Sequence, residues 1–248
     1  MISIIIATYN SGKTIYKALQ SVKDQRFQDW ECIIVDGSSK DNTLEIVKEF
    51  VNEDSRFRYI SEPDDGIYDA YNKGWKNSRG EWIYYLGSDD WLTENGVKEL
   101  MDYAKQDIDI LCSSIFLYHV DGSISKISAY NGKSAYHQGV IMKKNLIARL
   151  GGFNVKYKIL ADSDLLVRAI LAECVIKESN CTPIAYFTQG GTSSNLGTLI
   201  QTSKEKYRIY RNSNLVGNPT WETIVFAIQK LKSMIYRSLR KKLNFTIK

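Results

Sequence analysis

Short apolar runs alternate with helical patterns through the first third of the chain, and this alternation constrains the fold more than any other feature. Ile2–Ala7 is typical of a fully buried strand, and residues 13–24 follow with Ile15, Ala18, Leu19 and Val22 on one helical face. Further apolar runs of strand length lie at 31–35, 57–60 and 82–86. Strands separated by helices in this way favour an α/β fold, with a mostly parallel sheet and helices on both faces.

The second half of the chain has a different pattern. Residues 108–118 and 123–128 flank Val120-Asp121-Gly122, which predicts a β-hairpin, and residues 139–142 form another apolar run. Residues 161–171 are typical of a helix. We therefore expect antiparallel additions in the second half, a single large domain over 1–200, and a basic helical extension over 201–248.

The composition constrains the cellular compartment of the protein. The four cysteines are far apart, with no Cys-x-x-Cys pair, which favours a reduced cytoplasmic protein over a disulfide framework or a zinc site. The start of the chain lacks the basic lead-in of a signal peptide. No apolar run approaches the roughly 18 residues that a membrane span requires.

The net charge of +5 is concentrated near the carboxyl end of the chain. From Pro219 onward there are seven Lys or Arg residues against one acid, Glu222, giving +6, so the preceding residues sum to −1. Apolar residues recur there at three and four positions apart: Trp221, Ile224, Val225, Ile228, Leu231, Ile235 and Leu239. Such a helix can lie on an anionic membrane surface, or it can pack on the domain or on a dimer partner. Nucleic acid is disfavoured because no basic and aromatic platform accompanies the helix.

Polar clusters follow three of the predicted strands. They are Thr8-Tyr9-Asn10, Asp36, and Ser88-Asp89-Asp90. Ligands of parallel sheets bind beyond the carboxyl ends of the strands, so these clusters predict one site. Two adjacent carboxylates after a buried strand suit a divalent cation that holds a diphosphate, although Gly, Ser and Asp also gather in ordinary turns.

Five segments together resemble family 2 glycosyltransferases, which have the GT-A fold. They occur in the order and spacing of that family over roughly residues 1 to 195: 4–10, 33–43, 69–74, 86–90 and 161–165. A Rossmann dehydrogenase is disfavoured because no Gly-x-Gly-x-x-Gly follows the first strand. The Gly-rich signature of sugar nucleotidyltransferases is likewise missing from residues 7 to 20.

The resemblance implies a nucleotide-binding set among the first two clusters. Thr8, Tyr9 and Asp36 would hold the uracil and ribose of a nucleotide sugar, and a carboxylate can accept the N3–H of uracil. Asn10 belongs to the same loop, where a purely structural turn is the alternative. Asp65 is a further candidate for the base pocket, although the Pro-Asp-Asp-Gly sequence around it equally suits a turn.

The resemblance also implies a metal motif at the third cluster. Asp89 would contact the ribose or a metal-bound water, and Asp90 would ligate Mn²⁺ or Mg²⁺ bridging the two phosphates. Ser88 stands where a strict Asp-x-Asp motif has its first acid. One carboxylate, completed by waters and phosphate oxygens, remains a common arrangement for Mg²⁺.

Asp162 is the candidate general base by the same resemblance. A carboxylate within hydrogen-bond reach can take the proton that an acceptor hydroxyl loses as it attacks. Family members usually carry Glu before this Asp, and here Ala161 replaces it; helix capping is the alternative role for Asp162. Asp164 competes for the role of base, but Arg168 lies four residues on and predicts an ordinary ion pair.

Two further features are less specific. His137 is either a structural residue or, by resemblance to family members with a His-Gln pair here, a residue that faces the acceptor or the diphosphate. The polar segment 189–194 either closes over the donor phosphates or is a surface loop.

These interpretations together predict an inverting glycosyltransferase that uses a UDP-sugar. The resemblance implies an acceptor such as a lipid-linked saccharide for surface polysaccharide, and a peripheral location at the inner face of the cell membrane. The alternative is a non-catalytic nucleotide-sugar-binding or membrane-scaffold protein on the same fold, because Ser88 and Ala161 replace two acids of the family pattern.

Overall fold

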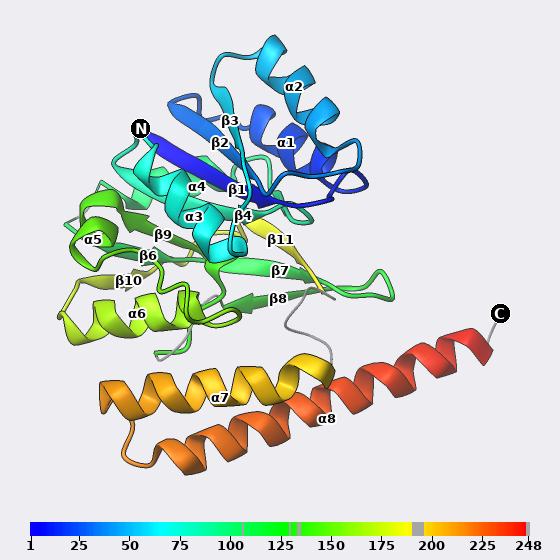
Figure 1. Ribbon diagram of the computed structural model, residues 1–248, viewed down its shortest axis with the longest axis vertical. Helices are drawn as coiled ribbons and strands as arrows, with labels where there is room; N and C mark the ends of the chain where they lie inside the picture. Colours follow the sequence, from blue (N-terminus) through cyan, green and yellow to red (C-terminus); the bar gives the residue numbers. More distant parts are fainter. Residues whose placement is uncertain (106, 129, 133–134, 190–195, 247–248) are drawn as a thin grey trace.

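A seven-stranded sheet forms the centre of the molecule in the part of the chain that the structure describes (Figure 1). The computed structural model describes residues 1–105, 107–128, 130–132, 135–189 and 196–246. In the order β10-β6-β9-β4-β1-β2-β3, the strands are Ile176–Glu178, Ile110–Cys112, Val140–Lys143, Trp82–Gly87, Ile2–Thr8, Trp30–Asp36 and Phe57–Ser61. β1 pairs in parallel with β2 and β4, β2 with β3, and β10 with β6, whereas β9 runs antiparallel to both β4 and β6. The mostly parallel sheet with antiparallel additions is confirmed.

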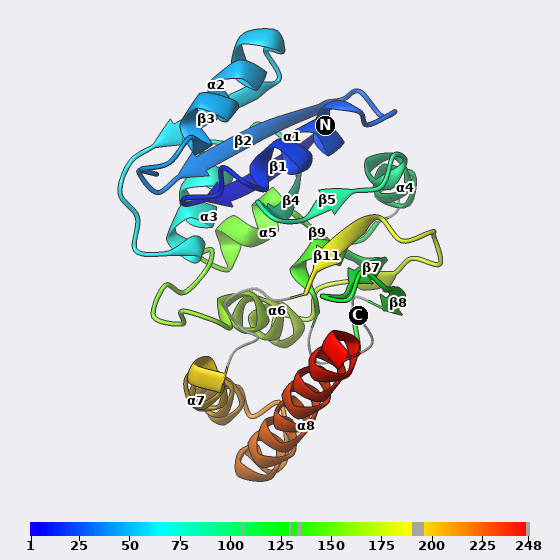
Figure 2. The ribbon, with the colours of Figure 1, turned by 90° about the vertical axis from the view of Figure 1, so that its right-hand side faces the viewer.

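Helices cover both faces of this sheet (Figure 2). One face carries α1 (Ile15–Lys23), α2 (Thr43–Glu53) and α4 (Gly96–Tyr103). The opposite face carries α3 (Ile67–Lys76), α5 (Lys144–Arg149) and α6 (Ala161–Leu171). The layers follow from the alternation of side chains along each strand: Ile4 and Ile6 pack against the first set, and Ile5 and Ala7 against the second.

A smaller four-stranded sheet, in the order β5-β11-β7-β8, lies beside the central one within the described residues. Its strands are Trp91–Leu92, Ala185–Thr188, Ser114–Tyr118 and Ile124–Ser128. β7 and β8 form the expected hairpin, with the His119 amide donating to the Ser123 carbonyl over 2.8 Å.

The segment 108–118, which precedes the predicted hairpin turn, contains two strands. The chain leaves the central sheet after Cys112 and enters the smaller sheet at Ser114. Ser113 between them is buried, its amide donates to the Gly139 carbonyl over 2.7 Å, and its hydroxyl bonds that of Ser179 over 2.7 Å. These bonds hold the chain at the point where it changes sheets, which an apolar run does not reveal.

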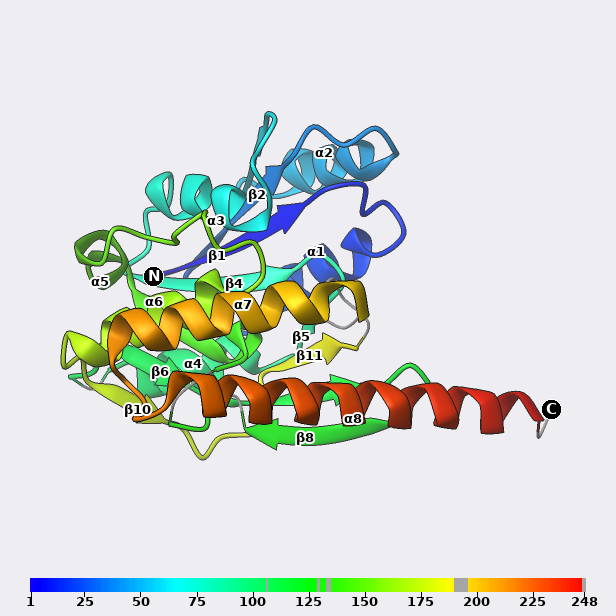
Figure 3. The ribbon, with the colours of Figure 1, turned by 60° about the horizontal axis from the view of Figure 1, so that its bottom comes forward.

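Two antiparallel helices complete the described chain: α7 (Leu196–Ser213) and α8 (Pro219–Thr246) (Figure 3). α7 packs against α6 and begins before the expected boundary at residue 200. Its Ile209 and Tyr210 belong to the same buried cluster as the α6 side chains. Trp221, Ile224, Ile228 and Leu231 of α8 are exposed. Among the described residues, no helix combines the length and apolar character that crossing a membrane demands.

Candidate active site

The ends of β1, β2 and β4 bring the three polar clusters together. Thr8 lies opposite Asp36 in the parallel ladder, and Ala7 lies opposite Gly87. A cavity of about 1420 Å³ lies against these strand ends. Eight of the candidate residues line it: Thr8, Tyr9, Asn10, Ser88, Asp89, Asp90, His137 and Asp162. Asp36 and Asp65 do not line it.

The loops after β1 and β2 are tied to each other. Asn10 and Ser38 have φ angles of 51° and 64°, in the left-handed region that side chains other than glycine rarely adopt. The Asn10 amide donates to Ser39 Oγ, and the Lys40 amide donates to Asn10 Oδ1, each over 2.8 Å. Such backbone strain costs on the order of 1–3 kcal/mol per residue and persists where surrounding bonds over-determine it. The rim that carries Tyr9 is therefore fixed in place.

Asp36 is turned away from the cavity. Its side chain is 0% exposed and accepts hydrogen bonds from the Ser39 amide (3.1 Å) and from Ser61 Oγ (2.7 Å), as well as from Ser39 Oγ. The carboxylate therefore organises the loop after β2, and its contact with a base stays a prediction. Asp65 also lies off the cavity, where its carbonyl accepts a 2.9 Å hydrogen bond from Lys158 Nζ.

Asp90 is the most deeply placed carboxylate of the cavity. It is 1% exposed; its Oδ1 accepts a hydrogen bond from the Thr188 amide (2.8 Å), and its Oδ2 from Gln138 Nε2 (2.9 Å). Burial raises the pKa of Asp90 to about 7, and the neighbouring Asp89 carboxylate adds to the shift, against the two hydrogen bonds. A Cβ at position 87 would lie 2.5 Å from Asp90 Oδ2, so any side chain in place of Gly87 would displace the Asp90 carboxylate.

The residues at this point fit a divalent cation only together with donor phosphates. The described ranges contain no group of three or more His, Cys, Asp or Glu side chains arranged to hold a metal ion. They do offer the exposed carboxylate of Asp89 beside that of Asp90, and both are hard oxygen ligands. Mg²⁺ in particular is usually bound by one or two carboxylates plus substrate phosphates and waters. The donor set therefore suits such an ion.

Asp162 lies at the start of α6, where the helix dipole favours a negative charge. Its Oδ1 accepts a hydrogen bond from the Ser163 amide (2.7 Å) and lies 3.3 Å from the Tyr68 hydroxyl, whose proton is shared with the Ile159 carbonyl at 2.7 Å. Its Oδ2 lies 3.5 Å from His137 Nδ1. The carboxylate is thus oriented from three sides while its side chain stays 21% exposed.

Asp164, the competing base, makes the ion pair that the sequence predicts. Its Oδ2 lies 2.8 Å from Arg168 Nη2, and it does not line the cavity. Burial raises the pKa of Asp164, against the opposing charge of Arg168. The spacing of two residues places it on a different side of the helix from Asp162.

Three buried polar atoms beside the cavity have no hydrogen-bond partner within the structure as described: Thr8 Oγ1, Tyr71 Oη and His137 Nε2. Burial, together with the charges of Asp90, Asp162 and Asp89, strongly raises the pKa of Tyr71, so this hydroxyl keeps its proton. Buried polar groups without partners are rare in folded proteins. The three residues line the cavity, but these particular atoms are covered by the surrounding protein.

Several site residues could not be recognised from the sequence. Gln138, which donates to Asp90, is held by the Tyr84 hydroxyl bonding its carbonyl over 2.7 Å. Its only sequence signal is its place beside His137. Thr188 reaches Asp90 from the end of β11, far along the chain.

Glu205 of α7 is a further site residue that could not be recognised from the sequence. It is 3% exposed, and its carboxylate accepts hydrogen bonds from the amides of Lys158, Ile159 and Leu160 over 2.9, 3.0 and 3.0 Å. These amides directly precede α6 and Asp162. A helix of the expected extension therefore fixes the turn that presents the candidate base.

The C-terminal helices also form one wall of the cavity. The side chains that line it are Thr202, Lys206, Ile209 and Tyr210 from α7, and Phe226, Gln229 and Lys230 from α8. Gln189 lines the cavity as well, whereas residues 190–194 of the expected closing segment lie outside the described residues.

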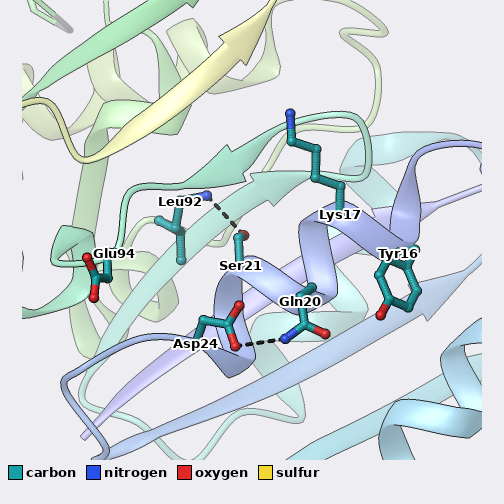
Figure 4. Close-up of a pocket in the computed structure, with 7 residues that line it drawn as sticks. All are labelled: Tyr16, Lys17, Gln20, Ser21, Asp24, Leu92 and Glu94. Carbon is teal, nitrogen blue, oxygen red and sulfur yellow. Dashed lines mark hydrogen bonds between the residues drawn. The ribbon is translucent and has the colours of Figure 1, made fainter.

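A second hollow, of about 540 Å³, lies beside α1 (Figure 4). Two pairs of its polar groups bond each other: Gln20 Nε2 donates to Asp24 Oδ1 over 2.7 Å, and the Leu92 amide donates to Ser21 Oγ over 3.0 Å. None of the predicted site residues lines this hollow. The chemistry is therefore assigned to the larger cavity.

A mostly parallel sheet whose strand ends hold an acidic pair, with a third carboxylate at a helix start in the same cavity, is the arrangement that the resemblance to family 2 glycosyltransferases implies. The chain matches the profile described as "Glycosyl transferase family 2" over residues 3–155. The chain therefore belongs to glycosyl transferase family 2, and the predicted family and enzyme class are confirmed.

Curated relatives agree with this assignment. A PGL/p-HBAD biosynthesis glycosyltransferase of Mycobacterium tuberculosis is 30% identical over 206 residues, which is 79% of each chain. The chondroitin synthase of Escherichia coli is 35% identical over 112 residues, covering 45% of this chain and 16% of that protein. The chain is thus a nucleotide-sugar-dependent glycosyltransferase, of EC class 2.4.

Solved structures agree on the fold. S. aureus TarS, crystallised as residues 1–349 with UDP-GlcNAc, superposes with a TM-score of 0.73 at 20% identity, covering 95% of this chain and 72% of that one. The mannosyltransferase PcManGT of Pyrobaculum calidifontis, in complex with GDP-Man and Mn²⁺, gives 0.66 at 13% identity, covering 96% and 73%. The GT-A-like architecture is therefore confirmed.

Proposed function

We propose that the chain is an inverting glycosyltransferase that moves a sugar from a UDP-sugar to an acceptor hydroxyl. The observation that carries the proposal is the cavity shared by Asp89 and Asp90 on one side and the oriented carboxylate of Asp162 on the other. Asp162 takes the proton of the acceptor hydroxyl while that oxygen bonds the anomeric carbon. The bond from the anomeric carbon to the phosphate oxygen breaks, and UDP leaves with the electron pair, so the anomeric centre inverts.

Other residues orient this reaction. His137 and Tyr68 hold the two oxygens of Asp162, which leaves the carboxylate a restricted set of directions toward the acceptor. Thr8, Tyr9 and Asn10 border the cavity at the end of β1, where the base and ribose would lie. Ser88, whose hydroxyl is 2.9 Å from that of Ser11, joins this loop to the acidic pair.

Asp90, with Asp89 beside it, would hold Mn²⁺ or Mg²⁺ on the diphosphate. When bound, such an ion offsets the negative charge that develops on the leaving diphosphate. The Asp90 carboxylate, whose pKa of about 7 reflects its burial, gains a counter-charge from the cation. The structure of PcManGT, a protein of the same fold, is in complex with GDP-Man and Mn²⁺, which supports this proposal.

A panel of nucleotide sugars tests the reaction. The purified chain with Mn²⁺ should release UDP from at least one UDP-sugar, because slow hydrolysis of the donor needs only a working donor site. GDP- and dTDP-sugars are the matched controls and should release far less nucleotide. Absence of nucleotide release from every donor would overturn the proposal, and release from GDP-sugars alone would overturn its UDP part.

We further propose that the acceptor is a lipid-linked saccharide for surface polysaccharide. The enzyme would bind this acceptor at the cytoplasmic face of the membrane. Trp221, Ile224, Ile228 and Leu231 form an exposed apolar line on α8, on the helix that also carries most of the basic excess. An apolar line flanked by Lys and Arg is typical of helices that lie on anionic membranes.

Co-sedimentation with anionic vesicles tests the membrane part. The pair Trp221→Ser and Ile228→Ser should strongly reduce the bound fraction, because both exposed side chains would enter the interface. Val120→Ser with Val175→Ser is the matched control, since these valines are equally exposed but lie elsewhere. Equal partitioning of the two double variants would end the membrane proposal.

A further inference from the structure

Two exposed tyrosines line the large cavity at different places. Tyr9 is 61% exposed and follows β1, where the base and ribose of the donor are proposed to bind. Tyr136 is 47% exposed and directly precedes the 3₁₀ helix His137–Gly139. The other described Phe and Tyr side chains of the lining are half-buried or buried. A large ring that is exposed inside a cavity is a contact surface that a ligand can cover.

The backbone that carries Tyr136 is held by hydrogen bonds. Its carbonyl accepts a bond from the Gly139 amide over 2.9 Å. Gln138 is 3% exposed, and its carbonyl accepts a bond from the Tyr84 hydroxyl over 2.7 Å. A ring on a fixed backbone loses little conformational freedom when a ligand binds, which favours affinity.

Tyr136 is adjacent in the chain to a residue that contacts the proposed base. That residue is His137, whose Nδ1 lies 3.5 Å from Asp162 Oδ2. The ring of Phe187 supports the Tyr136 ring, with the two centroids 5.8 Å apart. The amide that directly follows Phe187 in the chain donates to Asp90 Oδ1 over 2.8 Å. The ring pair therefore belongs to the two segments that contact the base and the acidic pair.

A pyranose ring suits this surface. Its hydroxyls lie around its edge, and its C–H groups carry a partial positive charge that favours contact with the negative face of an aromatic ring. Gln189, two residues after Phe187, also lines the cavity and offers polar groups to such an edge. Aromatic side chains with a few polar groups among them are the usual lining of small-molecule sites.

We infer that the Tyr136 ring stacks on the acceptor sugar whose hydroxyl Asp162 deprotonates, an inference that rests on the proposed transferase function. The cavity, at about 1420 Å³, exceeds the roughly 300–1,000 Å³ of most ligand pockets, so it has room for donor and acceptor together. Tyr136 is thus a specificity-determining residue. It selects acceptors that present the C–H face of a sugar ring next to the base.

Saturation-transfer NMR on the full chain, with the donor site filled by UDP and Mg²⁺, tests this inference. The probes are methyl β-glucoside, methyl β-galactoside and methyl N-acetyl-β-glucosaminide, and sorbitol is the open-chain comparison without a ring face. At least one glycoside should bind the wild type, with saturation concentrated on the C–H groups of one ring face. Tyr136→Ala should weaken that binding by about tenfold, the order of one lost aromatic contact.

Tyr16→Ala is the matched control and should bind the glycoside like the wild type. Tyr16 is 55% exposed and has Phe50 as its ring neighbour at 5.4 Å, but it does not line the large cavity. Tyr136→Trp keeps an aromatic face and should retain affinity. Tyr136→Leu keeps an apolar side chain without that face and should lose affinity as Tyr136→Ala does.

Several outcomes overturn the inference. They are equal glycoside affinity in the wild type and Tyr136→Ala, sorbitol binding as tight as that of the glycosides, and no binding of any glycoside. Full affinity in Tyr136→Leu also overturns it, because an apolar contact would then suffice and an acyl chain would serve as well as a sugar.

A donor measurement separates the acceptor sugar from the donor sugar. In calorimetry with Mg²⁺ and no acceptor, the wild type and Tyr136→Ala should bind UDP-glucose, UDP-galactose and UDP-N-acetylglucosamine with the same affinities. Weaker binding by the variant would assign the ring to the donor sugar and overturn the inference.

The failure of this inference and that of the proposed function give different results. If the chain hydrolyses a donor but binds glycosides equally with and without the Tyr136 ring, only the acceptor contact is wrong. If glycoside binding depends on Tyr136 in a chain that hydrolyses no donor, the transferase function is wrong and a saccharide site remains.

Discussion

Asp162 lies beside a backbone amide, a tyrosine hydroxyl and an imidazole. Its role can be tested by replacing one carboxylate oxygen with an amide nitrogen. Asp162→Asn keeps the size of the side chain but cannot take a proton from the acceptor. We expect kcat to fall by about 10²–10⁴-fold, the usual contribution of a general base. Affinity for UDP with Mn²⁺ should stay nearly constant, because Asp162 is not assigned to the donor. Asp24→Asn, in the separate hollow, is the control, and full turnover by Asp162→Asn would refute the assignment.

The buried Asp90 predicts how stability depends on pH when no cation is present. The folded chain holds the Asp90 proton up to a pKa of about 7, whereas the unfolded chain releases it near 3.8. The stabilisation from this proton is therefore complete below about pH 4 and is lost as pH rises toward 7. Urea unfolding in a chelator, at several pH values from 4 to 8, should show this decline. Asp90→Asn should flatten it, and an identical slope in the variant would contradict the prediction.

At the scale of elements, α7 is part of the active site because Glu205 holds three amides just before α6. Glu205→Ala would remove the hydrogen-bond acceptor of those three part-buried amides, and a typical hydrogen bond contributes about 0.5–1.5 kcal/mol. We expect the midpoint of thermal unfolding to fall, and kcat in the surviving folded enzyme to drop with little change in the KM for the donor. Glu49→Ala, an exposed glutamate of α2, should change neither quantity. A lower donor affinity with normal kcat would place Glu205 elsewhere in the mechanism.

Elements whose signal is local could be predicted from the sequence, and contacts between distant elements could not. α6 has the expected bounds, Ala161–Leu171, because its pattern is local, and β4 with its acidic pair follows from an uninterrupted apolar run. The rule that ligands lie beyond the carboxyl ends of parallel strands places Thr8 and Asp90 together without any coordinates. Gln138 and Glu205 could not be predicted, because each acts through hydrogen bonds to a segment far away in the chain.

Asp36 shows a different limit of sequence reasoning. Its position at the end of β2 was predictable, but the direction of its carboxylate depends on Ser39 and Ser61, which both donate hydrogen bonds to it. A strand pattern predicts where the backbone of a residue lies, but it does not predict which groups hydrogen-bond its side chain. The same limit applies to Asp65.

At the scale of the whole molecule, the uneven charge predicts how the chain partitions between solution and membrane. Arg237, Arg240 and Lys241 lie in the basic part of α8. Near an anionic surface each Lys or Arg contributes about 1 kcal/mol, so replacing all three with Gln should reduce binding to phosphatidylserine vesicles by roughly 100-fold. Binding should also weaken with added salt. Unchanged partitioning, or equal loss on neutral phosphatidylcholine vesicles, would argue against an electrostatic contribution.

The helix α8 lines the cavity on one side and is exposed to solvent on the other. Phe226 and Lys230 of α8 line the cavity, and Trp221 and Ile228 lie on the opposite side of the same helix, in contact with solvent. The proposed membrane contact and the cavity therefore share one helix. If a ligand in the cavity shifts α8, thermodynamic reciprocity requires that it change the affinity for a bilayer by the same factor by which the bilayer changes the affinity for that ligand.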